Sequence, residues 1–415
     1  MISFKIEKCD LTDSCFQPKR SYCMESLFGN LHERLDKTKR LQDPYYEKLD
    51  FQKIISIYDI FKISKYQIAV KSNAQNISNA WLKMYELIHQ FRLIKKNQKK
   101  VVHFDNAAFP GSFILAGNHY AKTFARVKNY NWYGSSWIGY NNENRTTGEL
   151  LEDKYNMFKN YPNRWLMNKE FDGNVNDIKN QKYWEKELNH SVDLYTSDLG
   201  FETGENNDYL KQEYSHVQPN IGQVLAGLLT LKKGGSLVTK QYTFFESLNI
   251  SLYAVLTNLF EEVYICKPIT SRPPNSETYV IGKKYLGPFK EGTLGDKFIK
   301  LIENKIKNYD RKPLVYKKCL SKNFLKSIVE ASMIFERQIV YIKDRLDWYE
   351  QVKKKPTNLR RKYGKKILNE WHNEVTRKWR KENPVYYLKN FQKIKKIKET
   401  LKKPLKKKIK NDLKY

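Results

Sequence analysis

Two lysines and two carboxylates stand at positions from which they could share one cleft. Asp198 ends a predicted strand, Lys240 lies at the end of the next, and Glu277 begins the last predicted strand. Lys83 lies on a helix that precedes the first strong strand. In such a set the carboxylates orient a lysine side chain, while a neighbouring ammonium lowers its pKa. The four residues therefore indicate a lysine that can act as a general base.

The elements that must position these residues alternate between strands and helices. Apolar residues at helical spacing or in short runs predict helix 79–95, strand 101–105, strand 191–195, helix 221–231, strand 236–242, helix 248–259, strand 262–267 and strand 277–285. Gly234 and Gly235 are expected to close the helix before strand 236–242. This order predicts an α/β domain with a mainly parallel sheet, whose ligands bind beyond the carboxyl ends of the strands. An antiparallel last strand brings Glu277 to that same edge.

A turn follows the first strong strand. Residues 106–112 read NAAFPGS, and an apolar helix begins at Phe113. Gly111 allows a positive φ and a close approach of the backbone to another molecule. We therefore expect a turn here that can lie against a bound ligand.

These segments resemble the FtsJ-like family of S-adenosylmethionine-dependent RNA ribose 2'-O-methyltransferases over residues 79–286. The family pattern has a helix with Lys, D-x-x-x-x-P-G-G after a strand, a strand ending in Asp, L-K-x-G-G-x-x-x-x-K, and a late S-x-E. The matching segments here read AWLKMYE, DNAAFPGSF, LYTSDLG, LKKGGSLVTKQY and SRPPNSETYVIGKKY. The last loop is similar to that of cap methyltransferases of large cytoplasmic DNA viruses. The resemblance implies a Rossmann-like class I fold with a mainly parallel seven-stranded sheet and an antiparallel last strand.

The resemblance also implies the reaction. A ribose 2'-hydroxyl would attack the methyl group of S-adenosylmethionine in line, so the protein would align the reactants and remove a weakly acidic proton. Lys240 would be the base, Lys83 and Asp198 would tune and orient it, and Glu277 would hold the geometry. No metal is implied.

A second set of residues would bind the cofactor. The resemblance assigns this role to Asp105, Ala107, Pro110, Gly111, Ser112 and Asp177. Asp172 is a weaker candidate for the adenine-binding position of Asp177. Ser112 stands where the family has the second glycine, and Phe109 replaces a small residue, so the turn is bulkier than in the family.

The charge of the chain predicts a polyanionic partner. There are 76 Lys and Arg against 45 Asp and Glu, a formal net charge of +31, which favours nucleic acid first and an anionic membrane surface second. The sequence has neither a signal peptide nor an apolar run of the roughly 20 residues that a membrane-spanning helix needs. We expect a cytoplasmic protein, in a viral factory or virion if a virus encodes it, that binds RNA and no membrane. The resemblance implies 5'-capped mRNA, with a capping enzyme or an RNA polymerase as a protein partner.

The chain divides into four predicted parts. Residues 1–70 form a helical N-terminal extension, 71–290 the methyltransferase domain, 291–350 a helical C-terminal extension, and 351–415 a basic helical or flexible tail. The last part holds 24 Lys or Arg against 5 Asp or Glu, and its end, KKPLKKKIKNDLKY (402–415), is expected to be a solvated basic tail. Five cysteines without a CxxC pair are expected to be reduced thiols rather than metal ligands.

Four functions are compatible with these residues. Methylation of the first transcribed nucleotide of capped mRNA is the leading hypothesis, and methylation of an internal ribosomal RNA ribose is the alternative within the same chemistry. A non-catalytic RNA-binding subunit with the same fold is favoured by Ser112. A membrane-surface protein held by the basic tail is the remaining hypothesis.

Overall fold

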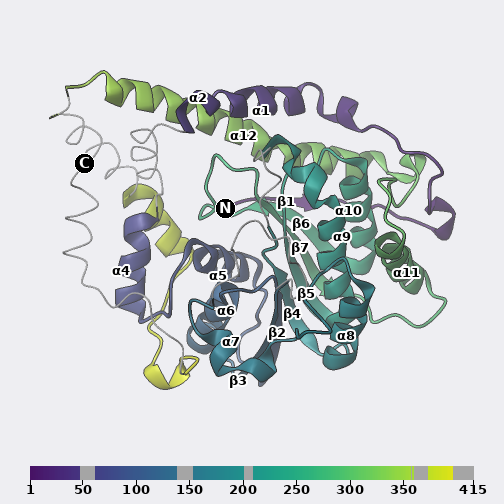
Figure 1. Ribbon diagram of the computed structural model, residues 1–415, viewed down its shortest axis with the longest axis horizontal. Helices are drawn as coiled ribbons and strands as arrows, with labels where there is room; N and C mark the ends of the chain where they lie inside the picture. The colour runs from purple at the N-terminus through teal and green to yellow at the C-terminus, as the bar shows by residue number, and fades with distance from the viewer. Residues whose placement is uncertain (47–60, 138–152, 201–208, 357, 359–372, 396–415) are drawn as a thin grey trace.

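The structure is a computed structural model, and it describes residues 1–46, 61–137, 153–200, 209–356, 358 and 373–395. A sheet in the order β1-β6-β7-β5-β4-β2-β3 runs through the centre of this described part (Figure 1). The strands are β1 (Ile2–Ile6), β2 (Lys100–Asn106), β3 (Asn129–Ser135), β4 (Val192–Ser197), β5 (Leu231–Gln241), β6 (Phe260–Lys267) and β7 (Thr278–Tyr285).

The pairing of the strands predicts where a ligand binds along the sheet. β2 pairs in parallel with β3 and β4, and β4 pairs in parallel with β5. β7 pairs antiparallel with both β5 and β6. The chain steps outward from β2 to β3 and then crosses to β4 on the other side, so the strand order reverses between β2 and β4, where such sheets bind ligands. The predicted α/β fold, with a mainly parallel seven-stranded sheet and an antiparallel last strand, is confirmed.

Helices cover both faces of the sheet, and each layer has its own apolar core (Figure 1). One face carries α5 (Asn79–Phe91) and α6 (Ser112–Thr123), with α4 (Lys62–Ser72) and the short α7 (Met157–Asn160) nearby. The other face carries α8 (Ile178–Leu188), α9 (Gln212–Thr230), α10 (Ser247–Leu259), α11 (Leu294–Lys307) and α12 (Lys322–Lys353). α1 (Leu31–Arg40), followed by α2 (Asp43–Tyr46), packs along α12. No described helix has the length and apolar character needed to cross a membrane.

Three strands differ from the sequence-based prediction, and one of them is β3, for which no strand was predicted. Residues 2–6, expected within a helical extension, form β1 and pair antiparallel with β6. β5 begins at Leu231, so Gly234 and Gly235 lie inside this strand rather than at the end of a helix. The register between β4 and β5 shifts there, because Val192 pairs with Leu231 while Leu194 pairs with Ser236. The division of the chain into four parts stays a prediction.

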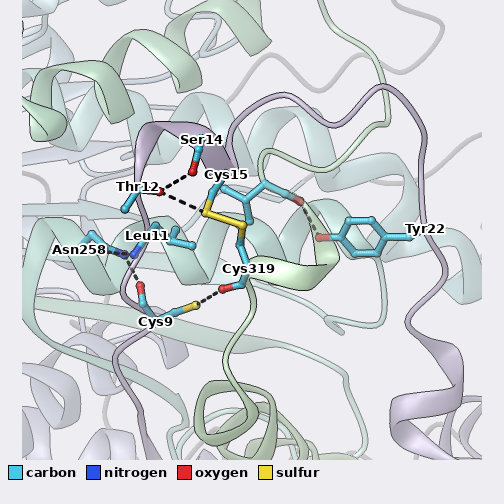
Figure 2. Close-up of a disulfide and its surroundings, with 9 residues drawn as sticks. Cys9, Leu11, Thr12, Ser14, Cys15, Tyr22, Asn258 and Cys319 are labelled. Atoms are coloured by element: carbon cyan, nitrogen blue, oxygen red, sulfur yellow. Dashed lines mark hydrogen bonds between the residues drawn. A yellow bond between two sulfur atoms is a disulfide. The ribbon is translucent and has the colours of Figure 1, made fainter.

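The expectation of reduced thiols is wrong for two of the five cysteines. Cys15 and Cys319 form a disulfide that joins the N-terminal segment to the segment before α12 (Figure 2). Cys9 lies beside this bond, and its Sγ donates to the carbonyl of Cys319 at 3.3 Å. Cys9, Cys23 and Cys266 are free thiols. Within the described residues, no group of three or more His, Cys, Asp or Glu side chains could hold a metal ion.

The C-terminal region is partly folded onto the domain. Residues 373–395 lie against α4, α5 and α6. They form a helix over 373–382 and an irregular segment after it. Trp379 is buried and its Nε1 donates to the buried carboxylate of Glu86 at 3.0 Å. Leu388 is also buried, and its N–H donates to a carbonyl at the end of α4 at 2.8 Å. The segment 373–395 is therefore docked on the domain, whereas the predicted solvated end, 402–415, lies outside the described residues.

Candidate active site

The four predicted catalytic side chains converge at the carboxyl edge of the sheet. Lys83 Nζ lies 2.8 Å from Glu277 Oε1 and 3.9 Å from Asp198 Oδ2. Lys240 Nζ lies 3.4 Å from Asp198 Oδ1 and donates to the Asp198 carbonyl at 3.0 Å. Each lysine therefore has a carboxylate partner, and two positive charges meet two negative charges in a largely buried cluster.

The strands and helix explain this convergence. Asp198 directly follows β4, and Lys240 is the penultimate residue of β5. Glu277 directly precedes β7, which runs antiparallel, so its first residues return to the same edge. α5 starts at Ser78, whose Oγ accepts from the N–H of Trp81 at 3.0 Å, and this start places Lys83 in the second turn. The residues meet as the sequence predicted, although their catalytic roles stay a prediction.

Three further side chains, which were not predicted from the sequence, complete the cluster. The Tyr279 hydroxyl lies 2.8 Å from Asp198 Oδ1 and 3.2 Å from Glu277 Oε1. Ser271 Oγ donates to Glu277 Oε1 at 3.0 Å. Lys267 Nζ donates to two main-chain carbonyls of the loop before β7 at 2.7 and 2.9 Å. The alternation of side chains along β7 links Tyr279 to the face of Glu277 and could have found it, whereas no local pattern marks the other two.

The charges of the cluster fix its protonation. Burial raises the pKa of Glu277, but the ammonium groups of Lys83 and Lys240 outweigh burial and lower this pKa to about 2. Burial lowers the pKa of Lys240, but the nearby Asp198, Tyr242 and Glu277 outweigh burial and raise this pKa above its ordinary value. The expectation that a neighbouring ammonium lowers the pKa of this lysine is therefore wrong for this arrangement, in which Asp198 lies closest. Lys240 is an ammonium here.

The turn after β2 carries four of the predicted cofactor residues, which are Ala107, Pro110, Gly111 and Ser112. Ala107 and Gly111 have φ angles of +57° and +105°, in the left-handed region that glycine tolerates best. Gly111 is the N-cap of α6, and a Cβ there would collide with Met157. Ser112 is buried, and its Oγ accepts from Ser78 Oγ at 2.9 Å. The Ser112 hydroxyl, at the position where the family has a glycine, is thus hydrogen-bonded within the protein.

Asp105 lies below this turn rather than at its surface. It is buried, and burial raises the pKa of its carboxyl well above the ordinary value. Thr196 Oγ1 donates to Asp105 at 2.6 Å and lies 2.7 Å from His103 Nε2. His103 Nδ1 in turn lies 2.6 Å from the hydroxyl of Tyr130. This buried network joins β2 to β3 and β4, so Asp105 supports the turn through the strands.

The two aspartates predicted near the adenine lie at different places. Asp177 is the exposed N-cap of α8, and its carboxylate accepts from a main-chain N–H of the first turn at 2.8 Å. Asp172 Oδ2 accepts from Trp137 Nε1 at 3.0 Å. Gly173 packs against the backbone of Ser136, directly after β3. The weaker sequence candidate, Asp172, therefore lies at the carboxyl end of β3, where a ligand above the neighbouring β2 turn would extend.

Comparison with known proteins gives the family. The sequence model of the FtsJ-like methyltransferases matches residues 77–285. The chain is similar to the probable methyltransferase EP424R of African swine fever virus, at 33% identity over 85% of this chain and 81% of that protein. It is also similar to uncharacterized protein L511 of Acanthamoeba polyphaga mimivirus, at 28% identity over 83% of this chain and 42% of that one. Cap-specific mRNA (nucleoside-2'-O-)-methyltransferase 2 of Drosophila melanogaster is 31% identical over 52% of this chain and 31% of its own length.

The chain belongs to the FtsJ-like methyltransferase family, and its cofactor is S-adenosylmethionine. The carboxyl edge fits such a molecule. The left-handed Gly111 directly precedes the N-terminus of α6, where N–H groups bind polar atoms. The neighbouring Ser135 Oγ, at the end of β3, is buried and makes no hydrogen bond with any described residue. A ligand atom at this edge would give that hydroxyl a partner.

Proposed function

We propose that this chain transfers a methyl group from S-adenosylmethionine to a ribose 2'-hydroxyl of RNA, at the first transcribed nucleotide of 5'-capped mRNA. The observation that carries the proposal is the buried cluster in which Asp198 holds Lys240 Nζ by its carboxylate and its carbonyl. A ribose hydroxyl is a weak acid, so its reaction needs a positioned base. The cap-specific relative supports capped RNA as the substrate.

When bound, S-adenosylmethionine would supply the methyl group: its carbon would bond to the 2'-oxygen as the carbon–sulfur bond breaks, and the electron pair of that bond would stay on sulfur. Lys240 Nζ takes the hydroxyl proton. To do so it must first release its own proton to solvent, because Asp198 and Glu277 keep it charged in the cluster. A further positive charge at this buried edge lowers the pKa of Lys240, which is the direction that a base requires.

The other residues hold this lysine in place. Asp198 fixes Nζ from two sides, and the hydroxyl of Tyr279 in turn lies 2.8 Å from the Asp198 carboxylate. Glu277 compensates the charge of Lys83, so only Lys240 has to lose a proton. A Cβ on Gly200 would lie 2.6 Å from Lys240 Nζ, so glycine there leaves room for this amine. These contacts orient the base before any substrate arrives.

A transfer assay with two RNAs tests the proposal. The RNAs share one sequence and differ only in their 5' ends, an N7-methylguanosine cap or a triphosphate. We expect transfer to the capped RNA alone, and digestion of the product to nucleosides should place the methyl group on the first transcribed ribose. Equal transfer to both RNAs would contradict cap methylation and point to an internal ribose. Cofactor binding by calorimetry without transfer to either RNA would favour a non-catalytic subunit. A cytoplasmic site of action and a capping enzyme or polymerase as partner belong to the same proposal.

A further inference from the structure

The outer face of the docked C-terminal segment carries exposed aromatic rings. Tyr386, Tyr387 and Phe391 are 51%, 60% and 72% exposed. Large apolar side chains of this exposure are scattered over the rest of the described surface, whereas these three fall within six residues. The same segment buries Leu388 in the domain, so the rings face outward while the aliphatic side chain anchors the segment.

Basic side chains surround these rings, and acidic ones are missing from the same stretches of sequence. Residues 87–104, 106–137 and 383–395 contain five, three and three Lys or Arg, and no Asp or Glu. The acidic residue nearest in α5 is Glu86, which is buried and bonded to Trp379. The two carboxylates of the docked segment, Glu374 and Glu382, precede the stretch that carries the rings, so positive charge predominates on that stretch.

The rings and lysines form one continuous surface across α6 and the docked segment. Lys96 Nζ lies 4.5 Å from the ring centre of Phe124, and Phe124 stacks with Tyr386 at 5.9 Å. Lys389 Nζ lies 5.8 Å from the ring centre of Phe391. The carbonyl of Tyr386 accepts from His119 at 2.9 Å, which fixes the segment on α6. We call the surface made by Lys96, Phe124, Tyr386, Tyr387, Lys389 and Phe391 the aromatic-basic track.

We propose that the aromatic-basic track binds single-stranded RNA of the substrate. Tyr387 and Phe391 stack on bases, and Lys96 and Lys389 contact phosphates. Rings interleaved with cations are the means by which proteins hold single strands without reading their sequence. A membrane surface fits less well, because insertion needs an apolar face of aliphatic and aromatic residues, and here Leu388 points into the domain. The track deepens the proposed function, since it rests on RNA being the substrate.

The track lies at the end of α6 opposite the cofactor turn, and the docked segment runs from there toward the start of α5. Ile394, at the end of the docked segment, exchanges two hydrogen bonds with Gln75, each of 2.9 Å. Three residues after Gln75, Ser78 caps α5, which carries Lys83, and donates to Ser112 in the cofactor turn. RNA on the track would therefore continue to the edge at which its ribose reacts.

Fluorescence anisotropy with the full chain and a labelled, unstructured, uncapped RNA of about 20 nucleotides tests the track. The variant is Tyr387→Ala with Phe391→Ala. The matched control is Met333→Ala with Val340→Ala on α12, whose side chains are 50% and 56% exposed. We expect the dissociation constant to rise at least about tenfold in the track variant and to stay within about twofold in the control. Equal losses in both, or none in the track variant, would overturn the proposal.

A charge pair gives an independent measurement. Lys389→Glu on the track and Lys326→Glu on α12 change the net charge by the same amount, so only their location differs. We expect the first to weaken RNA binding several times more than the second, and equal effects would count against the track. Phosphatidylserine vesicles serve as the competing ligand. If the ring substitutions weakened binding to the vesicles but not to RNA, the proposal would also be overturned. Binding is measured without transfer, so an absence of methylation would refute the proposed function and leave this result unchanged.

Discussion

The buried cluster of the candidate active site and the aromatic-basic track are both built around lysines, but their lysines have different partners. In the cluster, Lys83 and Lys240 lie 2.8 and 3.4 Å from carboxylate oxygens and are largely buried. In the track, Lys96 and Lys389 lie 4.5 and 5.8 Å from the centres of aromatic rings, and the stretches 87–104 and 383–395 that contain them have no acidic residue. The first arrangement orients a group, and the second presents charge to solvent.

This difference separates chemistry from binding. Charges that cancel inside a buried cluster act over short distances and are little affected by salt. Uncompensated surface charge attracts a polyanion and releases counterions when it binds, so its contribution falls as salt rises. We therefore expect changes in the cluster to alter kcat and changes in the track to alter the affinity for RNA.

The largest effect is expected from Lys240→Met. This change removes the proposed base, and kcat should fall by about a thousandfold, since general bases contribute factors of this size. RNA affinity, measured by anisotropy, should stay within about twofold of the unaltered chain, because the track is untouched. Lys240→Arg is the control, since arginine keeps the charge beside Asp198 but does not release a proton. An arginine variant with nearly full activity would refute the base.

A change of ionic strength should alter the affinity for RNA, which depends on the aromatic-basic track. Raising monovalent salt from about 50 to about 200 mM should weaken RNA binding roughly twentyfold if about three phosphates of a single strand are contacted. The value of kcat at saturating RNA should hardly move, because the cluster charges are paired. The Lys389→Glu variant should show a shallower dependence of the dissociation constant on salt. If kcat fell in parallel with the affinity for RNA, the cluster and the track would not have separate roles in catalysis and in binding.

Tyr279→Phe should give a smaller effect within the cluster. The change removes the hydroxyl that lies 2.8 Å from Asp198 and 3.2 Å from Glu277, while the buried ring stays. A hydrogen bond to a charged group is worth roughly 1.5–3 kcal/mol, so we expect kcat to fall about tenfold, with cofactor binding retained. Tyr253→Phe, a buried tyrosine of α10, is the matched control and should leave kcat unchanged. An unchanged kcat in Tyr279→Phe would show that Asp198 is held without it.

The sequence predicted the cluster because its residues are tied to strand ends. Asp198, Lys240 and Glu277 each adjoin the end of a strand, and an antiparallel last strand leaves one edge at which they can meet. Errors of one or two residues in strand bounds do not move them away from that edge. The cofactor role of Asp177 stays a prediction, because a local match to a family segment does not distinguish a ligand from a helix cap.

Long-range partners could not be predicted in the same way. The disulfide joins Cys15 to Cys319 across 304 residues, and β1 finds its partner in β6 at a similar separation. The composition of 351–415 indicates a basic helical or flexible tail and does not show that Trp379 hydrogen-bonds to Glu86, 293 residues away. No periodicity within a short window carries such information, since it depends on which surfaces the folded domain leaves open.

Lys267 tests the boundary between the two kinds of lysine, because it is buried like Lys240 but bonded to carbonyl and amide oxygens rather than to a carboxylate. Burial lowers its pKa to about 7, and the opposing charge of Glu277 only partly restores it. Its unfolded pKa is about 10.4, so between pH 7 and pH 10 the unfolded chain binds a proton that the folded chain has released. Stability conferred at this site should therefore rise with pH through that window, by at most about 1.4 kcal/mol per pH unit.

Lys267→Met removes the titrating group and should flatten the rise. The measurement is the free energy of unfolding in urea at several pH values between about 6.5 and 9. The difference between the unaltered chain and the variant should grow in favour of the unaltered chain as pH increases. Lys326→Met, at an exposed position of α12, is the control and should run parallel to the unaltered chain. The free energy of unfolding of Lys267→Met could instead run parallel to that of the unaltered chain over this pH range. Carbonyl oxygens would then suffice to keep a buried lysine charged, and a carboxylate partner would not be what distinguishes the lysines of the cluster.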